Sequence, residues 1–361
     1  MITQMIDAGY GDPYIVSERL SILNNSLSVD KKNSIGGLSY SYKNQIKDIL
    51  KTMFFFFKHN YDFELPEDTQ IIFGSGSTEL IGACYWAIQK KLKKKIIVNT
   101  NINKKRYYSL HKNITNIIQN CDWDINSINP DIIMNVSPSN PDGTLANKKN
   151  IVKGIYNIYD MAYANPLFTK EKINTAVFEE FINNDKIIII NSFSKYGLSG
   201  ARCGFTIIRD KEISNYIQEY TSLNTLSNPN TGFPFGGATG IITSINTYRN
   251  KILKNNFEDK IYNLINIRRK IFYILMKKYN VKSLNITNYV PYIYNNKSKE
   301  WWKNNFNVNV RPGSDFEDVN NNSRFNLMLT SKDWISFIYI FSNYNRNIKK
   351  IASQIEKKFK F

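Results

Sequence analysis

The sequence predicts an α/β fold in which helices sandwich a mostly parallel sheet, with a smaller α+β domain built from the C-terminal part and the N-terminal segment. Short apolar strands alternate with helical stretches between residues 66 and 210, which is typical of a parallel sheet covered on both faces. From about residue 211 the pattern turns helical and then mixes short strands with a last helix. We expect an N-terminal arm over 1–30, a large domain over 31–240 and a small domain over 241–361.

The large domain is predicted from short apolar runs that punctuate helical stretches. Residues 6–13 form a glycine-punctuated, extended entry followed by a helical pattern, and an amphipathic helix is expected over about 43–58. A strand at 69–73 precedes a long helix that ends near Leu92. Further strands are expected at 95–98, 131–136, 156–160, 186–190 and 205–208. Four consecutive isoleucines, at 187–190, predict that the fifth of these six strands is deeply buried.

The small domain is predicted from the mixed pattern of the last third of the chain. Helices are expected at 213–220 and over about 239–279, with a polar, glycine-containing bend between them. Short strands are expected at 289–294, 308–311 and 324–329, and a final helix begins near Lys332. This mixture indicates an α+β arrangement.

The formal net charge of +18 is a value that nucleic-acid-binding proteins often have. Here the lysines are spread along the 361 residues together with many Asn and Ile residues, and no zinc-finger or RNP-like motif accompanies them. We therefore expect no specific nucleic-acid partner. The densest basic run, at 90–95, ends a predicted helix, where cations interact favourably with the helix dipole.

The remaining composition predicts a cytoplasmic protein with no membrane span and no metal site. Three scattered cysteines do not suggest a disulfide framework, and the N-terminus lacks the basic and apolar regions of a secretory signal. No apolar run is long enough to span a bilayer. The two histidines, His59 and His111, have no Cys or His at metal-ligand spacing.

A single lysine, Lys195, follows the isoleucine strand among serines and glycines, with Arg202 shortly after it. A sheltered lysine near other cations becomes nucleophilic, because both surroundings favour its neutral form. The hydroxyl groups, including that of Ser192, and the guanidinium of Arg202 suit a phosphate dianion. The alternative is an ordinary polar loop after a strand.

A second segment also suits a phosphate. Residues 74–80 (Gly-Ser-Gly-Ser-Thr-Glu-Leu) lie between a strand and a helix, where backbone N–H groups and the helix dipole can face an anion. The loop matches neither the P-loop nor the dinucleotide-binding pattern. Alternatively, Ser77 or Thr78 simply caps the helix. Near the N-terminus, Gly11 could let the backbone approach a ligand closely, or could serve a plain turn.

Further candidates follow other predicted strands. Asn140 lies in a strong turn signal after the strand at 131–136, and Asp160 ends the strand at 156–160. Tyr108 lies in a loop where an aromatic ring could stack on a flat cofactor or join the core. Ligands of open parallel sheets bind at the carboxyl ends of the strands, which is where most of these residues fall.

Together these segments resemble the aspartate-aminotransferase superfamily of pyridoxal-phosphate enzymes (fold type I), and within it the alliinase and plant tryptophan-aminotransferase group. The resemblance covers the first two-thirds of the chain. The matching segments are Tyr10-Gly11-Asp12-Pro13, Phe73-Gly74-Ser75-Gly76-Ser77-Thr78-Glu79-Leu80, Ser139-Asn140-Pro141-Asp142-Gly143 with Asp160-Met161-Ala162-Tyr163, and Ser192-Phe193-Ser194-Lys195 with Arg202-Cys203-Gly204.

The resemblance implies pyridoxal 5′-phosphate as cofactor and Lys195 as the residue that forms the internal aldimine. Asp160 would keep the pyridine nitrogen protonated, Asn140 and Tyr163 would bond the ring hydroxyl, and Tyr108 would stack on the ring. Phosphate contacts are implied for Gly76, Ser77, Thr78, Ser192 and Arg202, and for Tyr40 toward the neighbouring subunit of a homodimer. Substrate contacts are expected from Arg324, which would grip the carboxylate, and from Gly11 and Asn140.

Two departures from the family pattern concern the cofactor. Lys195 and Arg202 are one residue closer in sequence than the family usually has them. The stretch before the stacking ring is also altered, so that Tyr107 competes with Tyr108 for that role.

The resemblance implies an aminotransferase that acts on an L-amino acid, aromatic or bulky and apolar in the subgroup, and a 2-oxo acid. A carbon–sulfur lyase is the second possibility, because it uses the same residues. The third is a basic binding protein that keeps the fold without catalysis.

Overall fold

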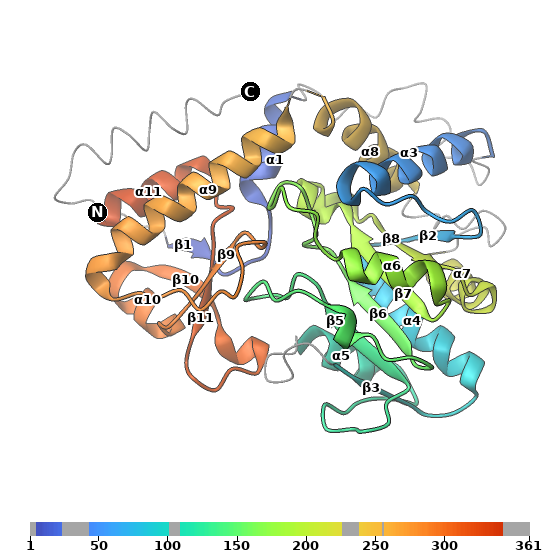
Figure 1. Cartoon of the computed structure of the whole chain (residues 1–361). Coiled ribbons are helices and arrows are strands. Elements are labelled where there is room, and N and C mark those ends of the chain that lie inside the picture. The colour runs from blue at the N-terminus through green and yellow to red at the C-terminus, as the bar shows by residue number, and fades with distance from the viewer. Residues whose placement is uncertain (1–4, 24–42, 101–108, 226–237, 255, 342–361) are drawn as a thin grey trace.

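The computed structural model describes residues 5–23, 43–100, 109–225, 238–254 and 256–341. Within these ranges the chain forms two sheets, one of seven strands and one of four, which occupy opposite ends of the molecule (Figure 1). Most of the bend expected between 224 and 237 lies outside the described residues.

The seven-stranded sheet confirms the mostly parallel α/β fold. Its strand order is β2-β8-β7-β6-β5-β3-β4, and β8 alone runs against its neighbours. The strands are β2 Gln70–Gly74, β3 Ile96–Asn99, β4 Cys121–Trp123, β5 Ile132–Val136, β6 Tyr156–Asp160, β7 Ile187–Ser192 and β8 Gly204–Ile208.

Helices cover both faces of this sheet, as the isoleucine run of β7 predicts. Ile188 and Ile190 pack in one apolar cluster with α4 (Ser77–Leu92), α5 (Ser109–Ile117) and α7 (Lys211–Thr225). Ile187 and Ile189 pack in the other with α3 (Lys43–Tyr61) and α6 (Thr175–Asn183). Because successive strand residues point to opposite faces, an unbroken apolar run suits a strand buried on both sides.

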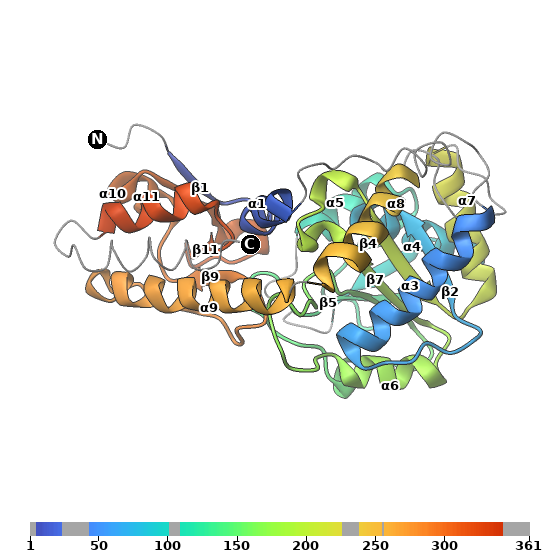
Figure 2. The ribbon, with the colours of Figure 1, turned by 90° about the horizontal axis from the view of Figure 1, so that it is seen from above.

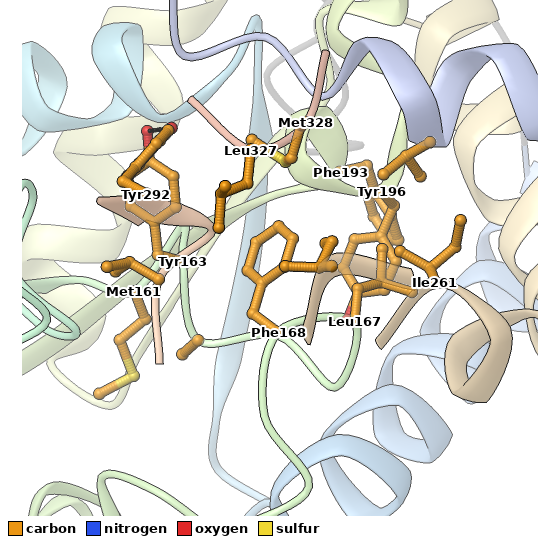
Figure 3. Close-up of a cluster of buried hydrophobic side chains, with 14 of the residues drawn as sticks. Met161, Tyr163, Leu167, Phe168, Phe193, Tyr196, Ile261, Tyr292, Leu327 and Met328 are labelled. Atoms are coloured by element: carbon orange, nitrogen blue, oxygen red, sulfur yellow. Dashed lines mark hydrogen bonds between the residues drawn. The ribbon is translucent and has the colours of Figure 1, made fainter. Parts of the chain in front are cut away.

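Aromatic rings fill the cluster between α3 and the sheet. Phe56 of α3 contacts Phe193, Phe205 and Tyr248, with ring centroids 5.6, 5.2 and 5.1 Å away. Figure 3 shows Phe193 and Tyr196 in this core. Tyr248 begins a short π-helical turn, Tyr248–Ile252, after α8 (Ala238–Thr247). The boundary between the large and small domains at residue 240 stays a prediction. Because Tyr248 packs against α3 of the large domain, we favour a boundary after the π-helical turn.

The four-stranded sheet joins the two ends of the chain, as the predicted fold class requires. β1 (Ile6–Ala8) pairs parallel with β10 (Val308–Pro312), and Ile6 lies opposite Val308. β11 (Ser323–Asn326) pairs antiparallel with β10 and with β9 (Tyr292–Asn295). The accompanying helices are α9 (Phe257–Met276), α10 (Lys299–Phe306) and α11 (Ser331–Phe341).

Helix α1 (Tyr14–Leu23) lies between the two sheets (Figure 2). The Ile15 N–H donates to Met328 O at 2.9 Å, and Ser17 Oγ donates to Gly197 O at 2.8 Å. The N-terminal part of the chain therefore bonds to segments that follow β11 on one side and β7 on the other.

Some predicted boundaries differ from the observed elements. The stretch 239–279 is interrupted after α8 by the π-helical turn and by Asn256, which has a φ of 51°. β9 begins three residues later than predicted and β11 ends three residues earlier. Helices α5, α6 and α10 and the three-residue strand β4 were not individually predicted, because none of them carries a long periodic apolar pattern.

Acidic residues partner the densest basic run. Lys90, Lys91 and Lys94 form ion pairs with Glu219, Asp210 and Asp131 at 2.6, 2.7 and 2.6 Å. These pairs link the end of α4 to neighbouring elements, so much of the local positive charge is balanced. No helix in the described part of the chain is long and apolar enough to cross a membrane.

The pairing of Gly74 with Gly204 allows β8 to pass close to the loop before α4. A methyl group on Gly204 would lie 2.5 Å from the Gly76 carbonyl carbon. We therefore expect Gly204→Ala to lower the free energy of unfolding by about 1–3 kcal/mol, because the backbone must shift. Urea unfolding monitored by circular dichroism measures the change. Gly200→Ala is the control, since a methyl group there would meet no atom of the described residues within 4 Å. Equal stability of the two variants would contradict the steric argument.

Candidate active site

A cavity of about 190 Å³ lies at the carboxyl ends of β5, β6 and β7, beside the first turn of α4. This is the edge at which open parallel sheets bind ligands. The predicted site residues that line it are Ser77, Thr78, Asn140, Asp160, Tyr163, Ser192, Lys195 and Arg202. Gly11, Gly76 and Arg324 each contact one of these residues from behind the cavity lining.

Lys195 lies in a 3₁₀ turn, Phe193–Tyr196, that directly follows β7. The side chain of Ser192 caps this turn by accepting a hydrogen bond from the Ser194 N–H at 3.1 Å. Lys195 Nζ donates to Gly11 O at 2.7 Å and lies 4.9 Å from the centre of the Tyr163 ring. The amine is thus held between the end of the central strand and the N-terminal segment.

Residues 9–12 connect β1 to α1. Their backbone carbonyls accept hydrogen bonds from side chains of β11, in the four-stranded sheet, and from the turn that follows β7, in the seven-stranded sheet. Arg324 Nη2 donates to Gly9 O at 2.8 Å, and Asn326 Nδ2 donates to Tyr10 O and Asp12 O at 2.9 and 3.0 Å. Lys195 donates to the remaining carbonyl, that of Gly11. This segment therefore fixes the position of the lysine relative to β11.

Gly11 is packed too closely to accept a side chain easily. A methyl group on it would lie 3.1 Å from the Tyr292 hydroxyl, 3.3 Å from that of Tyr163 and 3.6 Å from Lys195 Nζ. The predicted close approach is therefore seen, but to these three side chains.

Asp160 ends β6 with a side chain that is 8% exposed. Its Oδ1 accepts the Ala162 N–H at 3.0 Å. Burial raises the pKa of this carboxyl to about 6, although the Ala162 hydrogen bond and the positive charge of Lys195 act in the opposite direction. A carboxylate in this environment favours a cationic or N–H donor as its ligand.

The loop before α4 forms the opposite corner of the cavity. Gly76, with a φ of 100°, is the N-cap of α4, and as a glycine it has no side chain with which to cap the helix. The alternative prediction that Ser77 or Thr78 caps the helix is therefore wrong. Both residues instead start the helix and line the cavity, so their hydroxyl groups join the free N–H groups of the first turn. The Ser75 N–H donates to Glu79 Oε2, which closes the loop.

Arg202 brings a positive charge to the same corner. Its guanidinium donates to Ser75 O at 2.9 Å and to Ser199 O at 3.2 Å. Its Nη2 would lie 2.7 Å from a methyl group on Gly76, so glycine is needed there for space as well as for its positive φ. Although Lys195 and Arg202 are closely spaced in sequence, both line the cavity.

Arg324, on β11, is 3% exposed and lies behind Asn140. Its Nη1 donates to Asn140 Oδ1 at 2.8 Å, and its guanidinium lies 4.1 Å from the centre of the Tyr292 ring. The guanidinium does not line the cavity itself, so a ligand would reach it by displacing Asn140 or by entering beside that side chain.

Not every candidate can be located, and some cavity residues were missed. Tyr40, Tyr107 and Tyr108 lie outside the described residues. Asp12 and Ser194 belong to the quoted motifs, which could have identified them, whereas Leu110 and Ser199 carry no sequence signal of their own. The lining residues that were not predicted are Asp12, Leu110, Val136, Ala162, Ser194 and Ser199.

Part of the sequence is similar to known alliin lyases and to a plant aminotransferase-related protein. A family model described as Allinase matches residues 62–231. An alliin lyase of Allium cepa var. aggregatum is 28% identical over 177 residues, which cover 44% of this chain and 36% of the lyase. Tryptophan aminotransferase-related protein 2 of Arabidopsis thaliana is 28% identical over 170 residues, which cover 45% of this chain and 36% of that protein. The matched part of the chain thus spans about a third of the length of these relatives.

The fold has matches among solved structures as well. A protein from Methanococcus jannaschii, described as similar in its active site to kynurenine aminotransferases, superposes with a TM-score of 0.68. The two sequences are 18% identical, and the match covers 99% of this chain and 92% of the other. The chain thus has the fold of the fold type I superfamily of pyridoxal-phosphate-dependent enzymes, and its residues 62–231 are similar to the Allinase family. Pyridoxal 5′-phosphate (PLP) is the cofactor of this superfamily.

The donor set of the cavity fits PLP. An amine, Lys195, is present for the aldehyde, and a buried carboxylate, Asp160, is present for the pyridine N–H. The first turn of α4, with the hydroxyl groups of Ser77 and Thr78 and the charge of Arg202, offers the anion site that a phosphate requires. The fit extends to the charge of each group, since the anionic and cationic parts of PLP would face groups of opposite sign.

The raised pKa of Asp160 predicts a pH-dependent stability for the cofactor-free protein. The carboxyl holds its proton up to about pH 6 when folded but only to about 3.8 when unfolded, so its contribution to stability falls as the pH rises through this window. Asp160→Asn keeps an oxygen for Ala162 and does not ionise. We expect the unfolding free energy of Asp160→Asn, relative to that of the unmodified chain, to rise by about 1 kcal/mol between pH 5 and pH 8.

Urea titrations of the cofactor-free protein at several pH values measure this difference. Asp122→Asn is the control, because it makes the same substitution at a carboxylate that is 55% exposed. A difference between Asp160→Asn and the unmodified chain that stays constant across the pH range would contradict the burial argument.

Proposed function

We propose that the protein is a PLP-dependent aminotransferase, which moves an amino group between an L-amino acid with an aromatic or bulky apolar side chain and a 2-oxo acid. The observation that carries this proposal is that Lys195, Asp160 and Asn140 line one cavity, with Arg324 bonded to Asn140 behind it. When bound, PLP would draw electrons from the bond that breaks at the substrate Cα.

Lys195 would hold the cofactor and then move a proton. Its Nζ would bind the aldehyde carbon, and once released by an incoming amine it would take the proton from the substrate Cα as a general base. The hydrogen bond to Gly11 O supports this role, because it holds Nζ at one point of the cavity before the cofactor binds.

Asp160 and Arg324 would divide the binding of cofactor and substrate. Asp160 would accept the pyridine N–H and keep that nitrogen protonated, and its burial would strengthen the interaction. Arg324 would grip the substrate carboxylate through two parallel hydrogen bonds, together with Asn140. The phosphate would bind Ser77, Thr78, Ser192, Arg202 and the backbone at Gly76.

A carbon–sulfur lyase remains the second candidate, and the match to the Allinase model over 62–231 favours it. Elimination of a β-substituent would begin with the same loss of the Cα proton to Lys195. The third candidate is a binding protein that has lost catalysis, and it is less well supported. Such a protein has no need to gather an amine, a buried carboxylate and a guanidinium around the same cavity.

We also propose that the protein is a cytoplasmic homodimer, in which Tyr40 reaches the phosphate of the neighbouring subunit. Support comes from the superfamily, whose members are typically dimeric. The three cysteines, which are free and buried, are compatible with a reducing compartment.

The cofactor site is tested by adding PLP to the purified chain, reducing with borohydride and mapping the modified peptide. We expect a visible absorbance band and a single adduct on Lys195. Lys195→Ala should lose both, whereas Lys95→Ala, which changes an exposed lysine, should keep both. If the protein stays colourless with PLP, or if the adduct forms on another lysine, Lys195 is not the residue that binds the cofactor.

The reaction type is tested by supplying amino acids with and without a 2-oxo acid. Transamination requires the acceptor and yields an exchanged oxo acid, whereas elimination yields pyruvate and ammonia without it. In either case we expect Arg324→Lys to lower kcat/KM roughly 10- to 100-fold with unchanged PLP absorbance, because the paired hydrogen bonds to the carboxylate are lost. Arg311→Lys, on the neighbouring strand, should behave like the unmodified enzyme. Equal kcat/KM for the two variants would remove Arg324 from the site.

A further inference from the structure

Tyr292 is a fully buried tyrosine of β9 that reaches from the four-stranded sheet to the active site. Its hydroxyl lies 2.7 Å from that of Tyr163, which belongs to the loop after β6. The two rings meet edge to face, with centroids 5.4 Å apart and an interplanar angle of 73°. Figure 3 shows the two side chains next to each other. The contact therefore joins the two sheets through a pair of hydroxyl groups.

The same side chain contacts two further parts of the site. The guanidinium of Arg324 lies 4.1 Å from the centre of its ring, and its hydroxyl is 3.4 Å from Gly11 O, which also accepts from Lys195. Tyr292 is nevertheless not among the residues that line the cavity. It can therefore affect a ligand only through the residues that it holds.

Each phenol has one proton to donate, so the arrangement of this pair decides where the Tyr163 proton points. The 2.7 Å contact is a normal O–H···O bond, whereas the 3.4 Å contact to Gly11 O is long. Tyr292 therefore donates to Tyr163. The proton of Tyr163 is then free to be directed toward an oxygen atom in the cavity.

Building on the proposed function, we propose that Tyr292 is a positioning residue, whose hydroxyl donates to Tyr163 and thereby makes Tyr163 a stronger hydrogen-bond donor toward the cofactor. Tyr163 lines the cavity and can touch the ring of PLP, while Tyr292 stands one residue behind it. The role is specific to the hydroxyl group, because a phenylalanine would keep the ring that packs on Arg324.

The charges around Tyr163 act in the same direction. Burial raises the pKa of this phenol, but the positive charges of Lys195 and Arg324 and the hydrogen bond from Tyr292 outweigh burial and lower it overall. Asp160 and Asp12 line the same cavity, and their negative charges would oppose ionisation of the phenol. Removing the Tyr292 hydroxyl leaves these charges in place and deletes a single donor.

The test is a pH titration of the full-length, cofactor-free chain with its tyrosines labelled at Cζ with carbon-13 and observed by NMR. Tyr163→Phe identifies the Tyr163 signal by its loss. We expect Tyr292→Phe to raise the pKa of Tyr163 by about one unit, since a hydrogen bond to a phenolate is stronger than one to a neutral phenol.

Tyr294→Phe is the matched control. Tyr294 lies two residues further along β9 and is equally buried, but its hydroxyl donates to Asp318 away from the cavity. We expect no shift of Tyr163 in this variant. A Tyr163 pKa that is unchanged in Tyr292→Phe, or that moves equally in Tyr294→Phe, would overturn the role of Tyr292.

A second measurement uses the protein loaded with PLP, where the pH midpoint of the cofactor absorbance should also move in Tyr292→Phe and stay in place in Tyr294→Phe. If Tyr292→Phe does not fold, the reciprocal titration decides, because the Tyr292 signal must respond to Tyr163→Phe if the two hydroxyls are bonded. The NMR titration needs no cofactor. Failure of every variant to bind PLP would therefore count against the proposed function alone, and an unchanged titration against Tyr292 alone.

Discussion

The hydrogen bonds to the carbonyls of residues 9–12 are the constraint on which the candidate active site depends. Side chains from the end of β7 and from β11 converge on this short stretch of backbone, so the lysine and the arginine are positioned against the same segment. Backbone carbonyls are suited to this, because they are less mobile than long side chains. The close packing around Gly11 explains why this position of the segment carries no side chain.

The parts of the fold that could be predicted are those in which local sequence and tertiary burial agree. The four isoleucines of β7 form a buried strand because β-branched side chains favour the extended backbone and helices cover both faces of the sheet. Strand β4 has one buried residue, Cys121, and becomes a strand only because β3 offers it an edge. The pairing of Ile6 with Val308 likewise depends on a partner at the far end of the chain, which local patterns do not reveal.

The residues of the candidate site divide in the same way, into those that the local sequence reveals and those that depend on tertiary structure. The clustering of Lys195, Asp160 and Ser192 at one cavity was predictable because each ends or follows a recognisable parallel strand, and such ends meet at one edge. The capping role of Ser77 or Thr78 was wrong, because Gly76 takes the cap position with a positive φ that only glycine adopts easily. Tyr292 could not be distinguished from Tyr294, since both lie in one short strand and only the docking of the two sheets separates their partners.

The two buried charges of the site are compensated to different degrees, and this difference suggests an order of binding. Arg324 has Asn140, Gly9 O and the Tyr292 ring around its guanidinium, so it is stable without a ligand. Asp160 is held by the Ala162 N–H, and its raised pKa shows that this hydrogen bond and the charge of Lys195 only partly offset the cost of burying the carboxylate. In the proposed function, the pyridine ring of PLP would relieve that imbalance, whereas a substrate carboxylate would have to compete with the partners that Arg324 already has. The electrostatics of the empty protein therefore favour the cofactor over the substrate as its first ligand.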